Sequence, residues 1–180
     1  MSDYNKDVYF VKEFSAWGFG TWKKKWEYIN NHVLVKNYPS NILRSTKLLT
    51  KLIKNRYRII GGLLSCLSNN NVIGDIYITA HLHLNNIYCI FPNISKVKNW
   101  GHDGTGIHCG TILGENIFLQ QKIDEKKDVN YENIIVNEDK KIKSALKKYF
   151  NIPLTTKIKI ALKLFRHIII NELIIKNKEH

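Results

Sequence analysis

The first half of the chain shows two different patterns of hydrophobic and polar residues. Between residues 8 and 26 aromatic side chains are frequent and two glycines interrupt them. This pattern predicts a short strand, a tight turn and the first turn of a helix that Thr21 would cap. The apolar residues that follow recur with a helical period. We expect one helix that begins with Ser40 as its cap, and a second over 59–67 that ends in an asparagine-rich turn.

The second half changes pattern at each proline. Residues 76–84 alternate strongly enough for a strand, but a short helix fits them equally well. An Asn-Asn turn leads into 87–91, whose aromatic and β-branched content predicts a strand that the next proline ends. A third proline separates two further predicted helices, over 142–149 and over 155–175.

Composition narrows the class of protein. The chain has 180 residues, 44% of them hydrophobic and 24% charged, which is typical of one globular core. Its three cysteines have no CxxC spacing and favour a reducing compartment. We expect no secretory signal, and no run of about 18 apolar residues is present to span a bilayer. The sequence thus predicts a cytoplasmic protein, with a peripheral position on the inner face of the cell membrane as the other option.

The net charge of +13 indicates a polyanionic neighbour. Residues 140–180 hold eleven Lys or Arg against two acidic residues, and the last predicted helix also carries an apolar stripe. The stripe consists of Ile158, Leu162, Phe165, Ile169 and Leu173. Two interpretations stay open: the stripe lies on an anionic membrane surface, or it packs against the protein's own core. Nucleic-acid binding is not favoured, because charge alone supports it.

A loop rich in glycine follows the strand over 87–91. Asn99–Gly110 holds four glycines, two histidines, an aspartate, a threonine and a cysteine. Glycines let a ligand approach the backbone closely, and the polar groups between them can bind metal, phosphate or sugar hydroxyls. A surface loop whose glycines serve only its turns is the other interpretation.

Three further features can carry chemistry. The Trp/Gly segment, Trp17–Trp22, is either an aromatic cluster or a platform on which sugar rings stack. Asp75 is either a helix N-cap or a general base whose pKa apolar surroundings raise. Histidines and a cysteine also gather, but their spacing matches no structural zinc signature. They are His81, His83, His102, His108 and Cys109.

The order of these motifs resembles the C-terminal half of bacterial family-2-like GT-A glycosyltransferases. There a stretch of the form SSWGWATWKDRW leads to a DSW segment, then to a strand ending in Tyr-Pro and a loop like SKVxNxGxDGSGxHC. The counterparts here are Ser15–Trp26, Asp75–Tyr77, Phe91–Pro92 and Ser95–Cys109. Tyr77 replaces the family's tryptophan. A more distant resemblance is to the N-acetylglucosaminyltransferase of N-glycan processing.

The resemblance covers residues 5–112 and implies a fold. That fold is α/β (α+β in isolation): a partial GT-A fold with a short mixed sheet flanked by helices and with basic helices at the C-terminus. It divides the chain into an acceptor-side half at 1–114, a polar linker at 115–139 and a basic helical tail at 140–180.

The resemblance also implies a reaction, the inverting transfer of a sugar from a nucleotide-sugar donor to a glycan acceptor in surface polysaccharide synthesis. Asp75 would be the base that deprotonates the acceptor hydroxyl, and His108 would contact a divalent metal, Mn²⁺ or Mg²⁺. The sugar pocket would be walled by Trp17, Gly18, Thr21 and Trp22. The loop that covers the donor would supply Trp100, Gly101, His102, Asp103, Gly104, Thr105 and Gly106.

One feature of the family is missing from the sequence. GT-A enzymes hold their metal with an Asp-x-Asp motif on a nucleotide-binding half, and these residues contain no Asp-x-Asp. We therefore expect either a truncated product or a donor-binding half on a separate chain, and no transferase activity from this chain alone. The alternative function is a non-catalytic carbohydrate- or membrane-binding remnant of such an enzyme.

Overall fold

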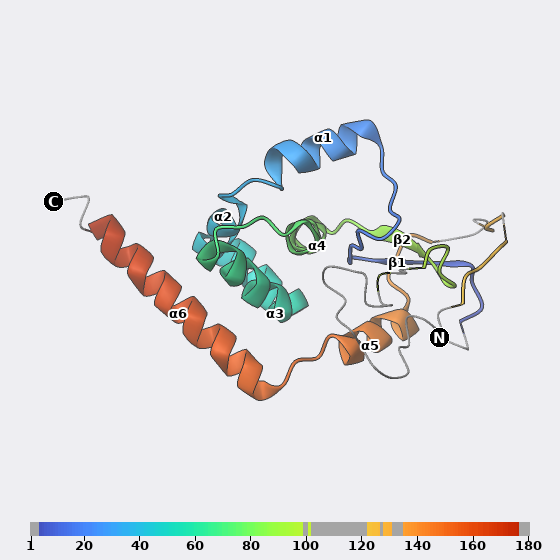
Figure 1. Cartoon of the computed structure of the whole chain (residues 1–180). Helices are drawn as coiled ribbons and strands as arrows, with labels where there is room; N and C mark the ends of the chain where they lie inside the picture. Colours follow the sequence, from blue (N-terminus) through green and yellow to red (C-terminus); the bar gives the residue numbers. More distant parts are fainter. Residues whose placement is uncertain (1–3, 99–100, 102–121, 127, 131–134, 177–180) are drawn as a thin grey trace.

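The computed structural model describes residues 4–98, 101, 122–126, 128–130 and 135–176, and the side chains of the last helix as far as residue 170. Within these residues the architecture is mixed, with six helices and one small antiparallel sheet (Figure 1). The sheet lies at one side of the molecule, the helical core lies at its centre, and a long C-terminal helix runs along the opposite edge.

The sheet pairs the two ends of the motif region. Strand β1 (Val8–Val11) runs antiparallel to β2 (Cys89–Pro92), and Tyr9 is the partner of Phe91. The two rings stack with their centroids 5.8 Å apart. Both strands confirm the sequence prediction. The expected mixed sheet is wrong in the described part of the chain, where it is a single antiparallel pair.

Helix α1 (Lys23–His32) begins two residues later than its predicted cap. Its N-cap position is held by Trp22, which makes no side-chain cap hydrogen bond, so the assignment of Thr21 as the cap is wrong. The predicted helical turn from Trp22 to Trp26 is confirmed, because the N–H of Trp26 donates to the Trp22 carbonyl at 3.0 Å. Within α1 no residue is buried.

The next helices also begin away from the predicted serine. Ser40 lies inside α2 (Tyr38–Arg44), and Ser45 instead caps α3 (Thr46–Ser68) by accepting from the Leu48 N–H at 3.4 Å. The two predicted helical stretches are continuous in α3 except at Arg56, whose backbone is not helical (φ −156°, ψ 66°). This break turns α3 into two helical halves.

Residues 76–84 form a helix and not a strand. They lie in α4 (Gly74–Asn85), which ends where Asn86 adopts the left-handed conformation (φ 56°). Each residue from Tyr77 to Leu82 is buried. The helix therefore lacks the exposed polar face whose 3.6-residue spacing would distinguish a helix from a strand in the sequence. His81 and His83 therefore stand on a helix rather than on the strand that their alternation suggested.

Helices α2, α3 and α4 build the core. Its most deeply buried members include Ile42, Leu52, Ile60, Leu63 and Tyr77. Two adjacent glycines of α3 bring other helices close: a Cβ on Gly61 would lie 2.9 Å from Ile160 of α6, and one on Gly62 would lie 2.9 Å from Ile76 of α4. Glycine at both positions lets the two helices approach the α3 backbone.

Two basic helices complete the described chain. Asp139 caps α5 (Lys140–Tyr149) by accepting from the Lys141 N–H at 2.8 Å, and Pro153 precedes α6 (Leu154–Lys176) as predicted. Helix α6 buries Ile160 and Leu164. The interpretation that the apolar stripe packs against the core is wrong for four of its five residues. Ile158, Leu162, Phe165 and Ile169 are exposed. The Leu173 side chain lies outside the described residues. No helix in the described part of the chain is long and apolar enough to cross a membrane.

Candidate functional site

The Trp/Gly segment packs against the residues that lead into the glycine-rich loop. Gly18 has a positive φ of 69°, and a Cβ at this position would lie 2.5 Å from Cγ1 of Val97. Both facts require glycine here. Ser95 and Lys96, beside Val97, are held in turn by residue 124: the Asp124 N–H donates to the Ser95 carbonyl at 2.9 Å, and Lys96 pairs with the Asp124 carboxylate at 2.8 Å.

The aromatic side chains of this region form a surface cluster. Trp22 is 72% exposed and Trp17 is 51% exposed. Phe19 contacts two other rings, those of Phe14 at 4.9 Å and Trp26 at 5.9 Å. The ammonium group of Lys25 lies over the Trp22 ring at 4.6 Å. Because the Trp17 and Trp22 side chains are more than half exposed, this cluster lies at the surface rather than in the core.

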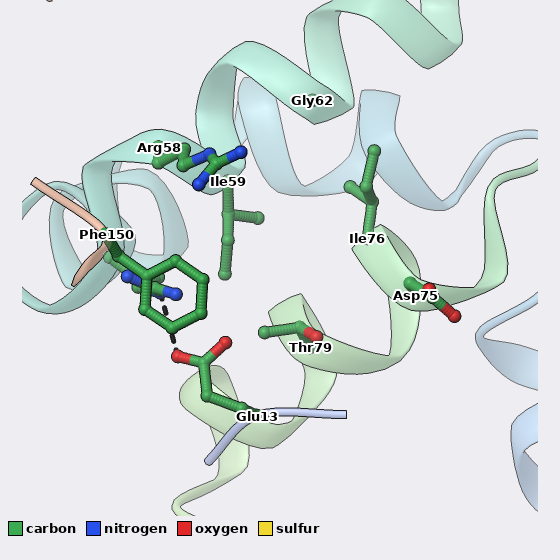
Figure 2. A pocket seen from close by; sticks show the side chains of 9 residues that line it. Glu13, Arg58, Ile59, Gly62, Asp75, Ile76, Thr79 and Phe150 are labelled. Carbon is green, nitrogen blue, oxygen red and sulfur yellow. Dashed lines mark ion pairs between the residues drawn. The ribbon is translucent and has the colours of Figure 1, made fainter. Parts of the chain in front are cut away.

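A cavity of about 460 Å³ lies between α3, α4, the segment after β1 and the end of α5 (Figure 2). Its lining residues are Glu13, Arg56, Arg58, Ile59, Gly62, Asp75, Ile76, Thr79 and Phe150. At one end Nε of Arg56 lies 2.9 Å from Oε1 of Glu13, the ion pair that Figure 2 marks with a dashed line. The Phe150 ring covers the guanidinium at 3.5 Å, and Nε2 of His83 approaches the same Glu13 oxygen at 3.4 Å.

This ion pair joins distant parts of the chain. The Arg56 side chain is 12% exposed and that of Glu13 is 17% exposed. Burial lowers the pKa of Arg56, and the Glu13 carboxylate opposes that shift. Nε makes no well-aligned hydrogen bond despite its short distance to Oε1. The contact is therefore an ion pair, and it fixes the break in α3 against the segment after β1.

Asp75 stands at the other end of the cavity, in the first turn of α4. The N-cap position belongs to Ile73, so the interpretation of Asp75 as the N-cap is wrong. Among the described residues it makes no hydrogen bond or ion pair, and burial by its neighbours raises its pKa although the residue itself is exposed. Figure 2 shows its carboxyl group turned away from Glu13 and Phe150.

His81 has a structural partner. Its burial lowers its pKa. Its Nδ1 lies 3.0 Å from the side-chain amide nitrogen of Asn85, which donates to this atom when the ring is neutral. Its ring also lies 5.6 Å from that of Tyr28, which joins α1 to α4. In the described ranges no three His, Cys, Asp or Glu side chains gather as they would around a metal ion.

The structure brings some predicted site residues together and not others. Trp17, Gly18, Thr21 and Trp22 lie between β1 and the start of α1, and none of them lines the cavity that Asp75 lines. Gly101 is half-buried. The other predicted residues of the glycine-rich loop lie outside the described residues, namely Trp100, His102, Asp103, Gly104, Thr105, Gly106 and His108.

Sequence reasoning missed Glu13 and Arg56. No motif marks them, because their pairing depends on a helix break and on segments that meet only in the folded chain. In comparisons with known proteins, no family model, no curated protein and no solved structure matches the chain.

Proposed function

We propose that this chain supplies the acceptor side of an inverting glycosyltransferase that transfers a sugar from a nucleotide sugar to a glycan hydroxyl. The contact between Gly18 and Val97 carries the proposal. It joins two of the segments on which the family resemblance rests, the Trp/Gly segment and the start of the glycine-rich loop. Neighbouring segments of this kind are what a shared sugar site needs.

Two further contacts support this proposal. The pairing of Tyr9 with Phe91 holds the strand that ends in Pro92 beside the strand that leads to the Trp/Gly segment. The contact of Tyr28 with His81 attaches α1 to α4, the helix that carries Asp75. The described parts of the four segments, with 95–98 standing for the last, are therefore linked by contacts.

The exposed tryptophans fit an acceptor glycan. Trp17 and Trp22 are large, exposed aromatic side chains, and an indole face suits the C–H bonds on one side of a pyranose ring. Backbone and polar groups of the following segment would receive the sugar hydroxyls. In this proposal the aromatic cluster binds and orients the acceptor.

Asp75 is the proposed base. The acceptor hydroxyl oxygen attacks the anomeric carbon while the hydroxyl proton passes to the Asp75 carboxylate. The bond from the anomeric carbon to the diphosphate oxygen breaks at the same time, and its electron pair leaves with the diphosphate. Asp75 has no hydrogen-bond or ion-pair partner among the described residues, and burial raises its pKa; both properties suit the uptake of this proton. Among the described residues no group of three His, Cys, Asp or Glu side chains could hold a metal ion.

Calorimetric titration of the chain with oligosaccharides tests the acceptor role. We expect Trp22→Ala to weaken binding about tenfold, because one aromatic face against a sugar contributes roughly 1–2 kcal/mol. Tyr149→Ala is the matched control, since Tyr149 is 74% exposed but lies on α5. Equal affinities for the two variants, or no glycan binding at all, would remove the acceptor site.

Release of nucleoside diphosphate tests the catalytic role. The chain alone, given nucleotide sugars and Mn²⁺, should release none above background, because it contains no Asp-x-Asp motif. With a nucleotide-binding half added, Asp75→Asn should lower kcat about 10²–10⁴-fold and leave acceptor affinity unchanged. Turnover that is independent of Asp75 would contradict its role as the base.

A second candidate function is carbohydrate binding without catalysis. One observation favours it: the exposed tryptophans and Asp75 do not line a common cavity. Glycan binding that depends on Trp22, together with no release of nucleoside diphosphate even when a nucleotide-binding half is added, would select this second function.

A further inference from the structure

Helix α6 has two apolar faces, and one of them packs on the protein. Ile160 and Leu164 are buried, and Ile160 rests on Gly61 of α3. The hydroxyl of Tyr57 donates to the Lys157 carbonyl at 3.1 Å, which fixes the same side of the helix to α3. These contacts determine which face of α6 looks inward.

The second apolar face looks outward. Large apolar side chains recur along it in steps of three and four residues, so they share one side of the helix, roughly opposite Ile160 and Leu164. Leu162 and Phe165 at its middle are each 63% exposed. The outward face consists of Leu154, Ile158, Leu162, Phe165 and Ile169.

Basic side chains border this outward face. Lys159 and Arg166 stand on one side of it and Lys157 on the other, and all three are exposed. From residue 154 to residue 170 there is no acidic residue. Apolar side chains flanked by cations match a surface with anionic groups above an apolar layer, which is what a lipid leaflet with acidic headgroups presents.

The position of α6 leaves this face accessible. In Figure 1 the helix runs as a straight rod along one edge of the molecule, and the other elements lie to one side of it. A flat surface can therefore contact the length of α6 without meeting the rest of the fold.

We propose that α6 binds peripherally to an anionic membrane surface through this outward face, lying parallel to the leaflet. The apolar side chains enter the boundary between headgroups and acyl chains, and the three cations contact acidic headgroups. The inference does not depend on sugar transfer. It concerns where the protein is held and not what it catalyses.

Two other partners fit the face less well. A nucleic acid would use the cations and leave the apolar residues in water. A second copy of the chain would bury the apolar residues but bring two basic borders together, and like charges at short range repel. Both partners are outcomes of the test.

Flotation of the full chain with lipid vesicles is the experiment. We expect binding to vesicles of phosphatidylcholine mixed with phosphatidylserine, and little binding to phosphatidylcholine alone. The double variant Leu162→Asn/Phe165→Asn should lose binding at least tenfold while leaving the charge unchanged. Tyr149→Asn is its matched control, because it removes a comparably exposed ring from α5.

The cations are tested separately. Lys159→Gln/Arg166→Gln should weaken binding to the acidic vesicles about 25-fold, since each cation near an acidic leaflet contributes about fivefold. Lys23→Gln/Lys24→Gln on α1 removes the same charge from another exposed site and should have a much smaller effect.

Several results would overturn the inference. Binding to acidic vesicles that survives Leu162→Asn/Phe165→Asn would mean simple charge attraction. A dimer in light scattering that this variant dissociates, without vesicle binding, would assign the face to a second copy. Tighter binding to duplex DNA than to acidic vesicles would assign the cations to nucleic acid.

Discussion

Replacement of Gly18 by alanine tests whether the Trp/Gly segment packs on the start of the glycine-rich loop. Two costs follow from the structure. A residue with a Cβ at φ 69° is disfavoured by about 1 kcal/mol. The new methyl would also lie 2.5 Å from Cγ1 of Val97, and moving that side chain costs about another 1–2 kcal/mol. Val97 is 38% exposed and can partly move away, so we expect a total near 2 kcal/mol.

Denaturant unfolding followed by circular dichroism measures this loss. Gly20→Ala is the matched control two residues away, because its φ is not in the left-handed region and nothing lies within 4 Å of its Cβ position. It should change stability by less than about 0.5 kcal/mol. Val97→Ala should remove the steric part, so that Gly18→Ala costs only about 1 kcal/mol in that background. Equal stability of the Gly18 and Gly20 variants would refute the contact.

Three other substitutions probe the helical core and its charges. Glu13→Gln should cost about 1–3 kcal/mol in denaturant unfolding, because Arg56 loses its anionic partner while staying nearly buried; an unchanged midpoint would mean that water replaces the carboxylate. Burial lowers the pKa of His81 below 6.5. The stability that neutral His81 contributes is therefore complete above pH 6.5 and is lost as the pH falls below that value. His81→Gln should reduce this acid sensitivity, and His167, shifted in the same direction, should retain the rest. Burial raises the pKa of Asp75 above 3.8, so ionised Asp75 lowers stability near neutrality and that loss disappears as pH falls towards 3.8. Asp75→Asn should therefore be at least as stable as the native chain at neutral pH, and a clear loss would assign Asp75 a structural role.

Local signals were enough to predict much of the secondary structure. The aromatic and β-branched run over 87–91 predicted β2, and Pro153 marked the gap between α5 and α6. The first residue of each helix was harder to predict, because more than one nearby polar residue is of a type that can cap a helix. Ser40 and Thr21 were both plausible caps by type, but Ser45 and Trp22 hold those positions.

Long-range features could not be found in the sequence. The alternation over 76–84 is compatible with a strand or a helix, and only its burial on all sides within the α2–α4 core decides for α4. The candidate site was found in part. Asp75 was identified by its neighbours in the sequence, but its position outside the tryptophan cluster depends on how α1 meets α4.

The attachment of α6 also has a consequence for local unfolding. Among the described side chains this helix buries only Ile160 and Leu164, whereas α3 and α4 each bury seven residues. Release of α6 therefore exposes little apolar surface and needs less free energy than global unfolding. In hydrogen exchange the amides of α6 should open as a unit before those of α3 and α4. The last helix and the central core thus form two cooperative units of unequal stability.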